Sequence, residues 1–232
     1  MLPKLIAGVL SVALVSYLVK IYKPGNMAPN YKLIYFDAPG RAETIRYIFA
    51  VAGVEYEDYR FPKEKWPELK KEMPFGKVPV LEIDGRQVAQ SNAIARYLAK
   101  QFGLAGKSDW EALQSDVLVD TLEDLKMSMM GPMREQDPIR KEEQKVKVMK
   151  EVVPYYLSKF EKIVSENGGF SVGSELTWSD LAFAVSLDYF EQVYGGDALR
   201  PYPALKGLKD KVHALPAIAD WIAKRPPAPA KP

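Results

Sequence analysis

The chain has 232 residues, 47% of them hydrophobic and 27% charged, which is typical of a globular protein with one large or two small domains. Its formal net charge is only +2, and no basic stripe with interleaved aromatic residues occurs, so the sequence does not support nucleic-acid binding. It contains no cysteine and a single histidine, His213, which excludes disulfides, a thiolate nucleophile and two-histidine metal sites. Any thiol chemistry must therefore be brought by a ligand.

The start of the chain carries an uncharged apolar run, residues 5–19, with a lysine on either side. As a helix this run is roughly 22 Å long, and a short extension brings it close to the roughly 30 Å of a bilayer core. We expect residues 1–26 to be an uncleaved anchor that associates with membranes through residues 5–22, with a cleaved signal peptide as the second reading. Met27 offers an alternative start that would give a soluble form.

From residue 31 to residue 103 the sequence alternates strand and helix signals. The expected elements are strands over 31–36 and 55–61, a hairpin over 77–90 turning at Asp84-Gly85, helices over 41–53 and 91–103, and an irregular or briefly helical stretch over 63–76. Gly53 and Gly103 are the expected helix stops, and Ser91 is the expected N-cap. This order predicts a small four-stranded mixed sheet with helices on its faces.

The remainder of the chain is predicted to be all-helical. Apolar residues with helical spacing occupy 109–130, 138–166, 177–194 and 203–224. Thr177 and Asp180 form a sequence typical of a capping box. We therefore expect an α/β domain over 27–105, an all-helical domain over 106–225 and a proline-rich tail over 226–232.

A tyrosine hydroxyl is expected where the first strand ends. Tyr35 precedes the turn Asp37-Ala38-Pro39-Gly40, and Arg41 begins the next helix. A free thiol has a pKa of about 8.5, so roughly 3% of it is thiolate at pH 7. A hydrogen-bond donor that lowers this pKa by about two units is worth about 2.7 kcal/mol and makes the thiolate the dominant form. Tyr35 is thus placed to activate a thiol ligand.

Two further positions suggest a peptide-like ligand. A cis Val78-Pro79 bond would turn the backbone N–H and C=O of Val78 outward, where they could receive an added strand, whereas a trans proline would indicate an ordinary edge strand. Gln90 and Ser91 stand at a helix N-terminus, which favours a carboxylate, although Ser91 could serve only as a cap.

Together these stretches resemble the cytosolic glutathione transferases, specifically the sigma class, which includes arthropod transferases and hematopoietic prostaglandin D synthase. The resemblance covers about residues 30–226, and the segments that carry it are NYKLIYF, GRAETIRYIFA, WPELKKEMPFGKVPVLEIDG, QSNAIARYLAKQFGLAGK, VDTLEDL, LTWSDLAFA and ALPAIADWIAKRPP. It implies a thioredoxin-like N-terminal domain, an all-helical C-terminal domain and a homodimer.

The resemblance also implies the roles of individual residues. Tyr35 matches the catalytic tyrosine that hydrogen-bonds the glutathione thiolate, and Arg41 matches the arginine that supports it. Trp66 and Lys70 match residues at the glycyl end of glutathione, and Asp124 matches an acid that reaches the γ-glutamyl amine across the dimer interface. The other positions that match glutathione-binding residues are Gly76, Lys77, Val78, Pro79, Gln90 and Ser91.

In the prostaglandin synthase branch, an acidic cluster resembling Asp120, Glu123 and Asp124 binds a divalent ion. Here we interpret these residues as a solvated helix face apart from Asp124, and we expect no metal requirement. Residues 126–140 are expected to line the second-substrate pocket, with Met127, Met129, Met130 and Met133 either forming an adaptable apolar wall or belonging to the core. Around Gly131 that branch carries an aromatic residue that this chain lacks, which weighs against prostaglandin D synthesis.

The resemblance therefore favours a cytoplasmic glutathione S-transferase that joins glutathione, its co-substrate, to hydrophobic electrophiles such as lipid-peroxidation aldehydes and xenobiotics. Reduction of organic hydroperoxides by glutathione is a further expectation. One alternative is a glutathione-dependent prostaglandin-H2 D-isomerase, and an alternative of another class is a non-catalytic, crystallin-like or ligand-carrying protein.

Overall fold

The computed structural model describes residues 29–195 and 197–226. The predicted anchor or signal over 1–26, the alternative start at Met27 and the end of the tail, 227–232, lie outside these described residues. Within the described ranges no helix has both the length and the apolar character needed to cross a bilayer.

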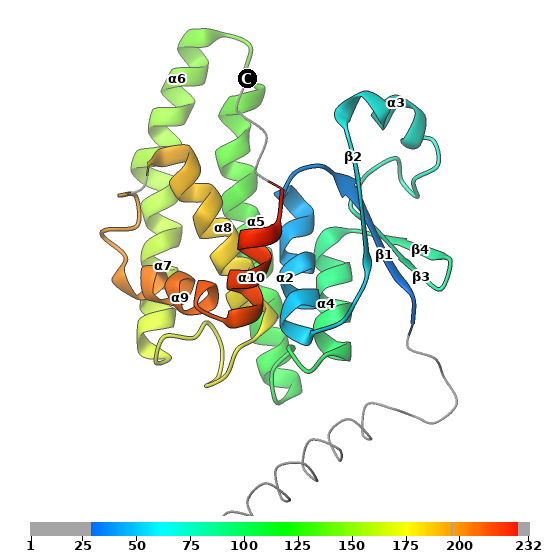
Figure 1. Cartoon of the computed structure of the whole chain (residues 1–232). Coiled ribbons are helices and arrows are strands. Elements are labelled where there is room, and N and C mark those ends of the chain that lie inside the picture. Colours follow the sequence, from blue (N-terminus) through cyan, green and yellow to red (C-terminus); the bar gives the residue numbers. More distant parts are fainter. Residues whose placement is uncertain (1–28, 196, 227–232) are drawn as a thin grey trace, which may run out of the picture.

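The N-terminal part is built on a four-stranded sheet, as the sequence predicts (Figure 1). Its strands are β1 (Tyr31–Phe36), β2 (Glu57–Phe61), β3 (Val80–Ile83) and β4 (Arg86–Ala89), in the order β2-β1-β3-β4. β1 is parallel to β2 and antiparallel to β3, which pairs antiparallel with β4, so the sheet is mixed. Asp84 and Gly85 have φ angles of 49° and 80°, the left-handed backbone that a two-residue hairpin turn requires.

Two helices cover the face of the sheet that looks toward the rest of the molecule (Figure 1). A short 3-10 turn, η1 (Gly40–Ala42), leads into α2 (Glu43–Ala52), which ends at Gly53 as predicted, and α4 (Ser91–Gln101) follows β4. Between β2 and β3 lie η2 (Lys63–Lys65) and α3 (Trp66–Leu69), the briefly helical stretch.

The prediction of Ser91 as an N-cap is wrong by one residue. Gln90 occupies the cap, because its carbonyl accepts the first helical hydrogen bond, from the Ile94 N–H at 2.9 Å. Its φ of 77° turns the chain from the hairpin into α4, and no side chain caps the helix. Ser91 is instead the first helical residue, so its N–H is among the groups that a helix leaves unpaired at its start.

The C-terminal part of the described chain is helical, as predicted. It contains α5 (Asp109–Arg134), α6 (Pro138–Lys147), a π-helical segment η3 (Val148–Val152), α7 (Val153–Glu166), α8 (Trp178–Tyr194), α9 (Pro203–His213) and α10 (Pro216–Lys224). The segment 203–224, which carries helical spacing throughout, forms two helices, because Pro216 holds Leu215 in an extended conformation with φ −63° and ψ 127°.

One hydrophobic core joins the two parts. Phe49 of α2, Leu98 of α4, Leu122 of α5 and Leu181 of α8 are all at most 2% exposed and belong to the same cluster. α2 and α4 lie between the sheet and the helices α5 and α8 (Figure 1). Close packing through this shared core fixes the sheet, with the candidate site at one end of its strands, relative to α5 and α8.

The predicted capping box at the start of α8 is confirmed. The Asp180 carboxylate accepts the N–H groups of Thr177 and Ser171, each at 2.7 Å. Burial raises the pKa of Asp180, although these N–H donors favour its charged form. The box therefore fixes the loop before α8 as well as the helix start.

Candidate functional site

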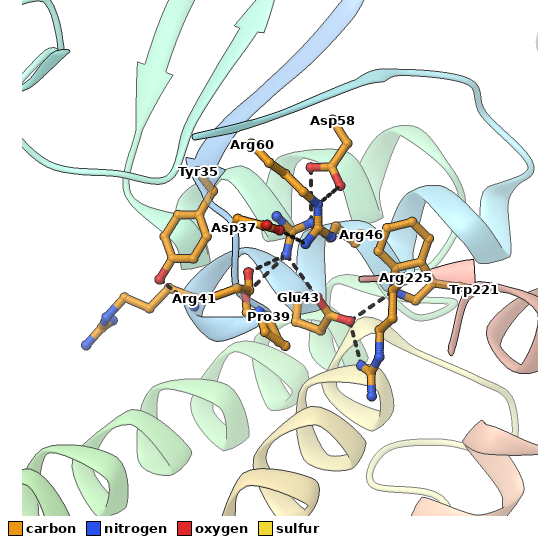
Figure 2. Close-up of polar contacts among 11 residues, drawn as sticks. Tyr35, Asp37, Pro39, Arg41, Glu43, Arg46, Asp58, Arg60, Trp221 and Arg225 are labelled. Carbon is orange, nitrogen blue, oxygen red and sulfur yellow. Dashed lines mark hydrogen bonds and ion pairs between the residues drawn. The ribbon is translucent and has the colours of Figure 1, made fainter. Parts of the chain in front are cut away.

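The centre of the site is the Tyr35 hydroxyl, at the end of β1. Tyr35 is 9% exposed, and its Oη accepts the backbone N–H of Arg41 at 3.0 Å. In Figure 2 the hydroxyl turns toward the Arg41 backbone, and the Arg41 side chain points away from it. Because the oxygen acts as the acceptor of this bond, the hydroxyl proton remains available for an anionic ligand atom. Support of Tyr35 by Arg41 thus comes through the Arg41 main chain.

Gly40 makes this contact geometrically feasible, although sequence reasoning did not assign it to the site. Its φ is +45°, and a Cβ built there would lie 2.5 Å from Tyr35 Oη and 2.9 Å from Tyr35 Cε1. Neither the backbone conformation nor the space suits a side chain. Glycine at this position therefore lets the turn close over the hydroxyl.

A buried arginine, Arg46 of α2, lies behind the tyrosine. It is 0% exposed, and its guanidinium is 5.8 Å from the centre of the Tyr35 ring. Its Nη1 donates to the carbonyl oxygens of Ala38 at 2.8 Å and Pro39 at 3.3 Å, in the turn that carries Gly40 (Figure 2). Arg46 therefore fixes the turn and places a cation against the tyrosine ring.

The charge of Arg46 is balanced by Glu43, which is 1% exposed. One Glu43 oxygen accepts Arg46 Nη1 at 3.0 Å, and the other accepts Trp221 Nε1 at 2.9 Å and Arg225 Nη1 at 2.7 Å. Burial would lower the pKa of Arg225, but its hydrogen bond with Glu43 raises that pKa overall. The end of the helical part is thus bonded directly to the helix that supports the site.

Asp58 of β2 completes the network on the other side of Arg46. It accepts Arg46 Nε at 3.1 Å and Arg60 Nε at 2.7 Å, and Arg60 also reaches Asp37 at 3.2 Å. Sequence analysis missed this network. The one local signal was an acid and a base three residues apart, Glu43 and Arg46, on a face of α2 that is otherwise apolar.

Two of the three acidic residues on the predicted face of α5 interact with different arginines of the N-terminal part. Glu123 pairs with Arg41 Nη2 at 2.5 Å, and Asp120 lies 3.5 Å from Arg96 Nη2. Asp124 is exposed and forms no ion pair within the described chain. In the described ranges no group of three or more histidines, aspartates and glutamates is placed to hold a metal ion.

The strand register brings predicted site residues from three segments to the same end of the sheet. Ile34 of β1 and Ala89 of β4 both pair with Val80 of β3. The residues that come next, beyond this row, are Tyr35, Pro79 and Gln90. Three stretches that are far apart in the sequence therefore meet at the end of the sheet where β1 reaches Tyr35.

The neighbours of these residues are open to solvent. The Val78-Pro79 bond is cis, as one reading of the sequence predicted, and Lys77 before it is exposed. Gln90 is exposed and Ser91 half-buried at the start of α4. A ligand can therefore approach this edge.

Trp66, Lys70 and Gly76 lie in the segment between β2 and β3. The Trp66 ring packs on Phe36 and Phe61, at centroid distances of 5.3 Å and 6.0 Å, so it is anchored rather than solvated. Lys70 is exposed, and its side chain passes 3.5 Å from the position of a Cβ on Gly76, whose φ is 56°. The aromatic contacts of Trp66 hold this segment against the sheet.

Comparison with known proteins agrees with this geometry. Residues 31–100 match the family model of the glutathione S-transferase N-terminal domain, and residues 123–225 match that of the C-terminal domain. The chain is 45% identical over 197 residues to glutathione S-transferase S1 of Drosophila melanogaster, covering 85% of this chain and 79% of the relative. It is 43% identical over 198 residues to hematopoietic prostaglandin D synthase of Gallus gallus, covering 85% and 98%.

A solved structure, the prostaglandin synthase D of Nilaparvata lugens, superposes with a TM-score of 0.82 at 42% identity, covering 86% of this chain and 100% of that one. The mixed sheet and the helical part thus form the expected pair, a thioredoxin-like half followed by an all-helical half. The chain belongs to the glutathione S-transferase family, in agreement with its resemblance to the sigma class.

Proposed function

We propose that this protein conjugates glutathione to hydrophobic electrophiles and serves in detoxification. The observation that carries the proposal is the Tyr35 hydroxyl, which accepts the Arg41 N–H and keeps its own proton for a ligand. The bound thiol loses its proton to water, and the thiolate, held by the Tyr35 hydroxyl, attacks an electrophilic carbon to form a C–S bond. In a substitution the electron pair of the broken bond leaves with the departing group; in a conjugate addition the pair of the double bond moves to an enolate, which water protonates. Neither step needs a metal.

The proposed glutathione site follows the sheet edge. The γ-glutamyl carboxylate would bind at the start of α4 near Gln90 and Ser91, where unpaired N–H groups favour an anion. The cysteinyl portion would pair with the Val78 backbone before Pro79. The predicted contacts of the glycyl end and the intervening loop are Trp66, Lys70, Gly76 and Lys77. The meeting of Tyr35, Pro79 and Gln90 at one edge supports this arrangement.

The test is product formation by the full chain with glutathione and three electrophiles: an aryl halide, an α,β-unsaturated aldehyde and an organic hydroperoxide. We expect thioether products from the first two, and reduction of the third with glutathione disulfide as the second product. Calorimetry with glutathione alone separates the outcomes. Binding without any product would favour the non-catalytic carrier, and absence of binding would overturn the site itself.

The contact between Gly40 and Tyr35 gives a sharper prediction. In Gly40→Ala, the added Cβ displaces the hydroxyl, so we expect the thiol pKa of bound glutathione to rise and the free energy of unfolding to fall by about 1–3 kcal/mol. The matched control is Gly53→Ala, because Gly53 has a similar φ of 63° but no atom within 4 Å of the added Cβ. Thiolate absorbance and urea unfolding measure the two effects. Equal thiol pKa values in the two variants would contradict a role of the Gly40 contact in activation.

A second candidate function is prostaglandin-H2 D-isomerisation with the same thiolate. The similarity to hematopoietic prostaglandin D synthases favours it, and Gly131, where that branch carries an aromatic residue, weighs against it. Product analysis with the endoperoxide decides: prostaglandin D2 formation that depends on glutathione would support the isomerase, and conjugation without it would exclude that reading.

The protein is further proposed to be a homodimer, in which Asp124 of one subunit contacts the γ-glutamyl amine of the glutathione bound to the other subunit. Three large apolar side chains lie exposed along α5, Trp110 at 67%, Leu113 at 51% and Val117 at 55%. Their spacing places them on neighbouring turns of the helix, and an exposed apolar stripe of this kind is typical of an interface. Sedimentation velocity tests the dimer, and a monomer at micromolar concentration would exclude it.

A cytoplasmic location and membrane association through residues 5–22 are also proposals. Fractionation of cells that express the full chain tests them. Recovery entirely in the soluble fraction would argue against an anchor, and release to the medium would favour a cleaved signal.

A further inference from the structure

Three polar side chains of the second strand lie on the covered face of the sheet. Tyr56, Asp58 and Arg60 are spaced two residues apart, and residues with this spacing project to the same side of an extended chain. The register pairs Asp58 with Leu33 and Arg60 with Tyr35 of β1. Because Leu33 and Tyr35 belong to the main hydrophobic core, the three polar side chains face α2 rather than solvent.

Arg46 of α2 and Arg60 of β2 meet at the Asp58 carboxylate. Arg46 Nε donates to one oxygen at 3.1 Å and Arg60 Nε donates to the other at 2.7 Å (Figure 2). In a guanidinium the Nη2 atom lies on the same edge as Nε–H, so each Nη2 lies beside the carboxylate that its Nε binds. Tyr56 approaches from the strand, because its ring stacks at 4.2 Å on Phe49, three residues after Arg46 on α2.

Three donors of this cluster are buried and have no hydrogen-bond partner among the described residues: Arg46 Nη2, Arg60 Nη2 and Tyr56 Oη. The Arg46 side chain is 0% exposed and that of Arg60 is 13% exposed. Burial raises the pKa of Tyr56, and Asp58 adds to this rise, so the hydroxyl keeps its proton and can donate it. Buried donors normally have a partner, which can be a protein group, water or an ion.

The charges of the cluster favour an anion over water. Three guanidinium groups share two enclosed carboxylates: Arg46, Arg60 and Arg225 bond to Asp58 and Glu43. The third acid, Asp37, is 56% exposed and contacts Arg60 from the surface at 3.2 Å. Water could accept the free N–H groups but brings no charge, whereas a monovalent anion both accepts them and balances the additional guanidinium.

We propose that Arg46, Arg60 and Tyr56 bind one small monovalent inorganic anion of the size of chloride. The ion accepts the N–H groups of both Nη2 atoms and the O–H of Tyr56. Its donors are buried, and the Trp221 ring of α10 lies 5.7 Å from the Arg60 guanidinium carbon, so the ion must be small enough to be enclosed. Because Arg46 also fixes the turn over the Tyr35 hydroxyl, the ion stabilises the support of that turn.

The first test is urea unfolding of the full chain at fixed ionic strength, with sodium gluconate replaced stepwise by sodium chloride. The unfolding equilibrium constant should fall about tenfold for each tenfold rise in chloride above its dissociation constant, because the ion binds only the folded state. Tyr56→Phe removes one donor and should weaken the affinity for chloride on the order of tenfold. Tyr59→Phe is the matched control, because Tyr59 contacts Lys32 and should leave the chloride dependence unchanged.

The second test locates the ion by anomalous diffraction from crystals grown with sodium bromide. A bromide peak in contact with Arg46 and Arg60, together with chloride-dependent unfolding that Tyr56→Phe weakens, supports the inference. Stability that is independent of chloride overturns it: without a peak, water satisfies the donors, and with a peak, bromide is an adventitious ion only. Chloride dependence without a peak at this cluster, or equal in wild type and Tyr56→Phe, also overturns it. Neither test needs glutathione, so the outcome is independent of the proposed function.

Discussion

Replacing Tyr35 with phenylalanine is expected to raise the thiol pKa of bound glutathione by about two units and to lower the conjugation rate at pH 7 roughly 25-fold. With the hydroxyl present, a pKa near 6.5 would leave about three quarters of the bound thiol ionised, and without it only about 3% is ionised. The sign follows from what is removed: the hydroxyl donates to the anion and stabilises it, so its loss favours the protonated thiol. The ultraviolet absorbance of the thiolate, titrated against pH, measures this shift.

The matched control is Tyr97→Phe on α4, because Tyr97 is 44% exposed and belongs to no part of the proposed activation site. It should keep the wild-type titration. A wild type that binds glutathione with an ordinary thiol pKa, near 8.5, would show that the fold serves as a carrier. If both the wild type and Tyr35→Phe show the same lowered pKa, another group activates the thiol.

Substitution of Arg46 by methionine is expected to lower the free energy of unfolding by about 3–5 kcal/mol. The reason is that Arg46 is 0% exposed and its removal leaves Glu43 without one of its donors inside the core, while Asp58 also loses a partner. The free carbonyls of Ala38 and Pro39 add to the loss. Urea unfolding, followed by circular dichroism, measures the change.

Two control variants distinguish the loss of buried ion pairs from the loss of an exposed one, and the loss of the turn contacts from the loss of a donor to Glu43. Lys206→Met removes an exposed pair with Asp210 and should leave the free energy of unfolding nearly unchanged. Arg225→Met removes another donor to Glu43 without touching the turn, so it should destabilise the protein but leave the glutathione pKa unchanged. An Arg46→Met protein as stable as Lys206→Met would show that the buried charges are nearly neutral for stability.

The elements around Tyr35 were predictable because their signals are local. Alternating apolar residues define β1, the Asp84-Gly85 pair defines the hairpin, and Gly53 ends α2. The position of Tyr35 beside a helix start follows from the order of strand, turn and helix. The resemblance to a family assigned Pro79 and Gln90 to one ligand, and the sheet register places both residues at the same end of the sheet.

The buried network was not predictable, because its partners are distant in the chain. Helical spacing puts Ile45, Ile48 and Phe49 on one apolar face of α2, and it gives no reason to bury Glu43 or Arg46 beside them. Their burial depends on charged and polar groups from other elements, such as Asp58 and Trp221, and a local sequence pattern does not indicate those groups.

The bond between Glu43 and the last helix also affects how the protein can be made. Trp221 and Arg225 follow Glu43 by 178 and 182 residues. At a synthesis rate of about 5–20 residues per second, a nascent chain waits roughly 10–40 s between exposing Glu43 and producing these donors. During that interval the carboxylate has one of its three donors at most, so the network around Glu43 can be completed only after the ribosome has added α10 and Arg225.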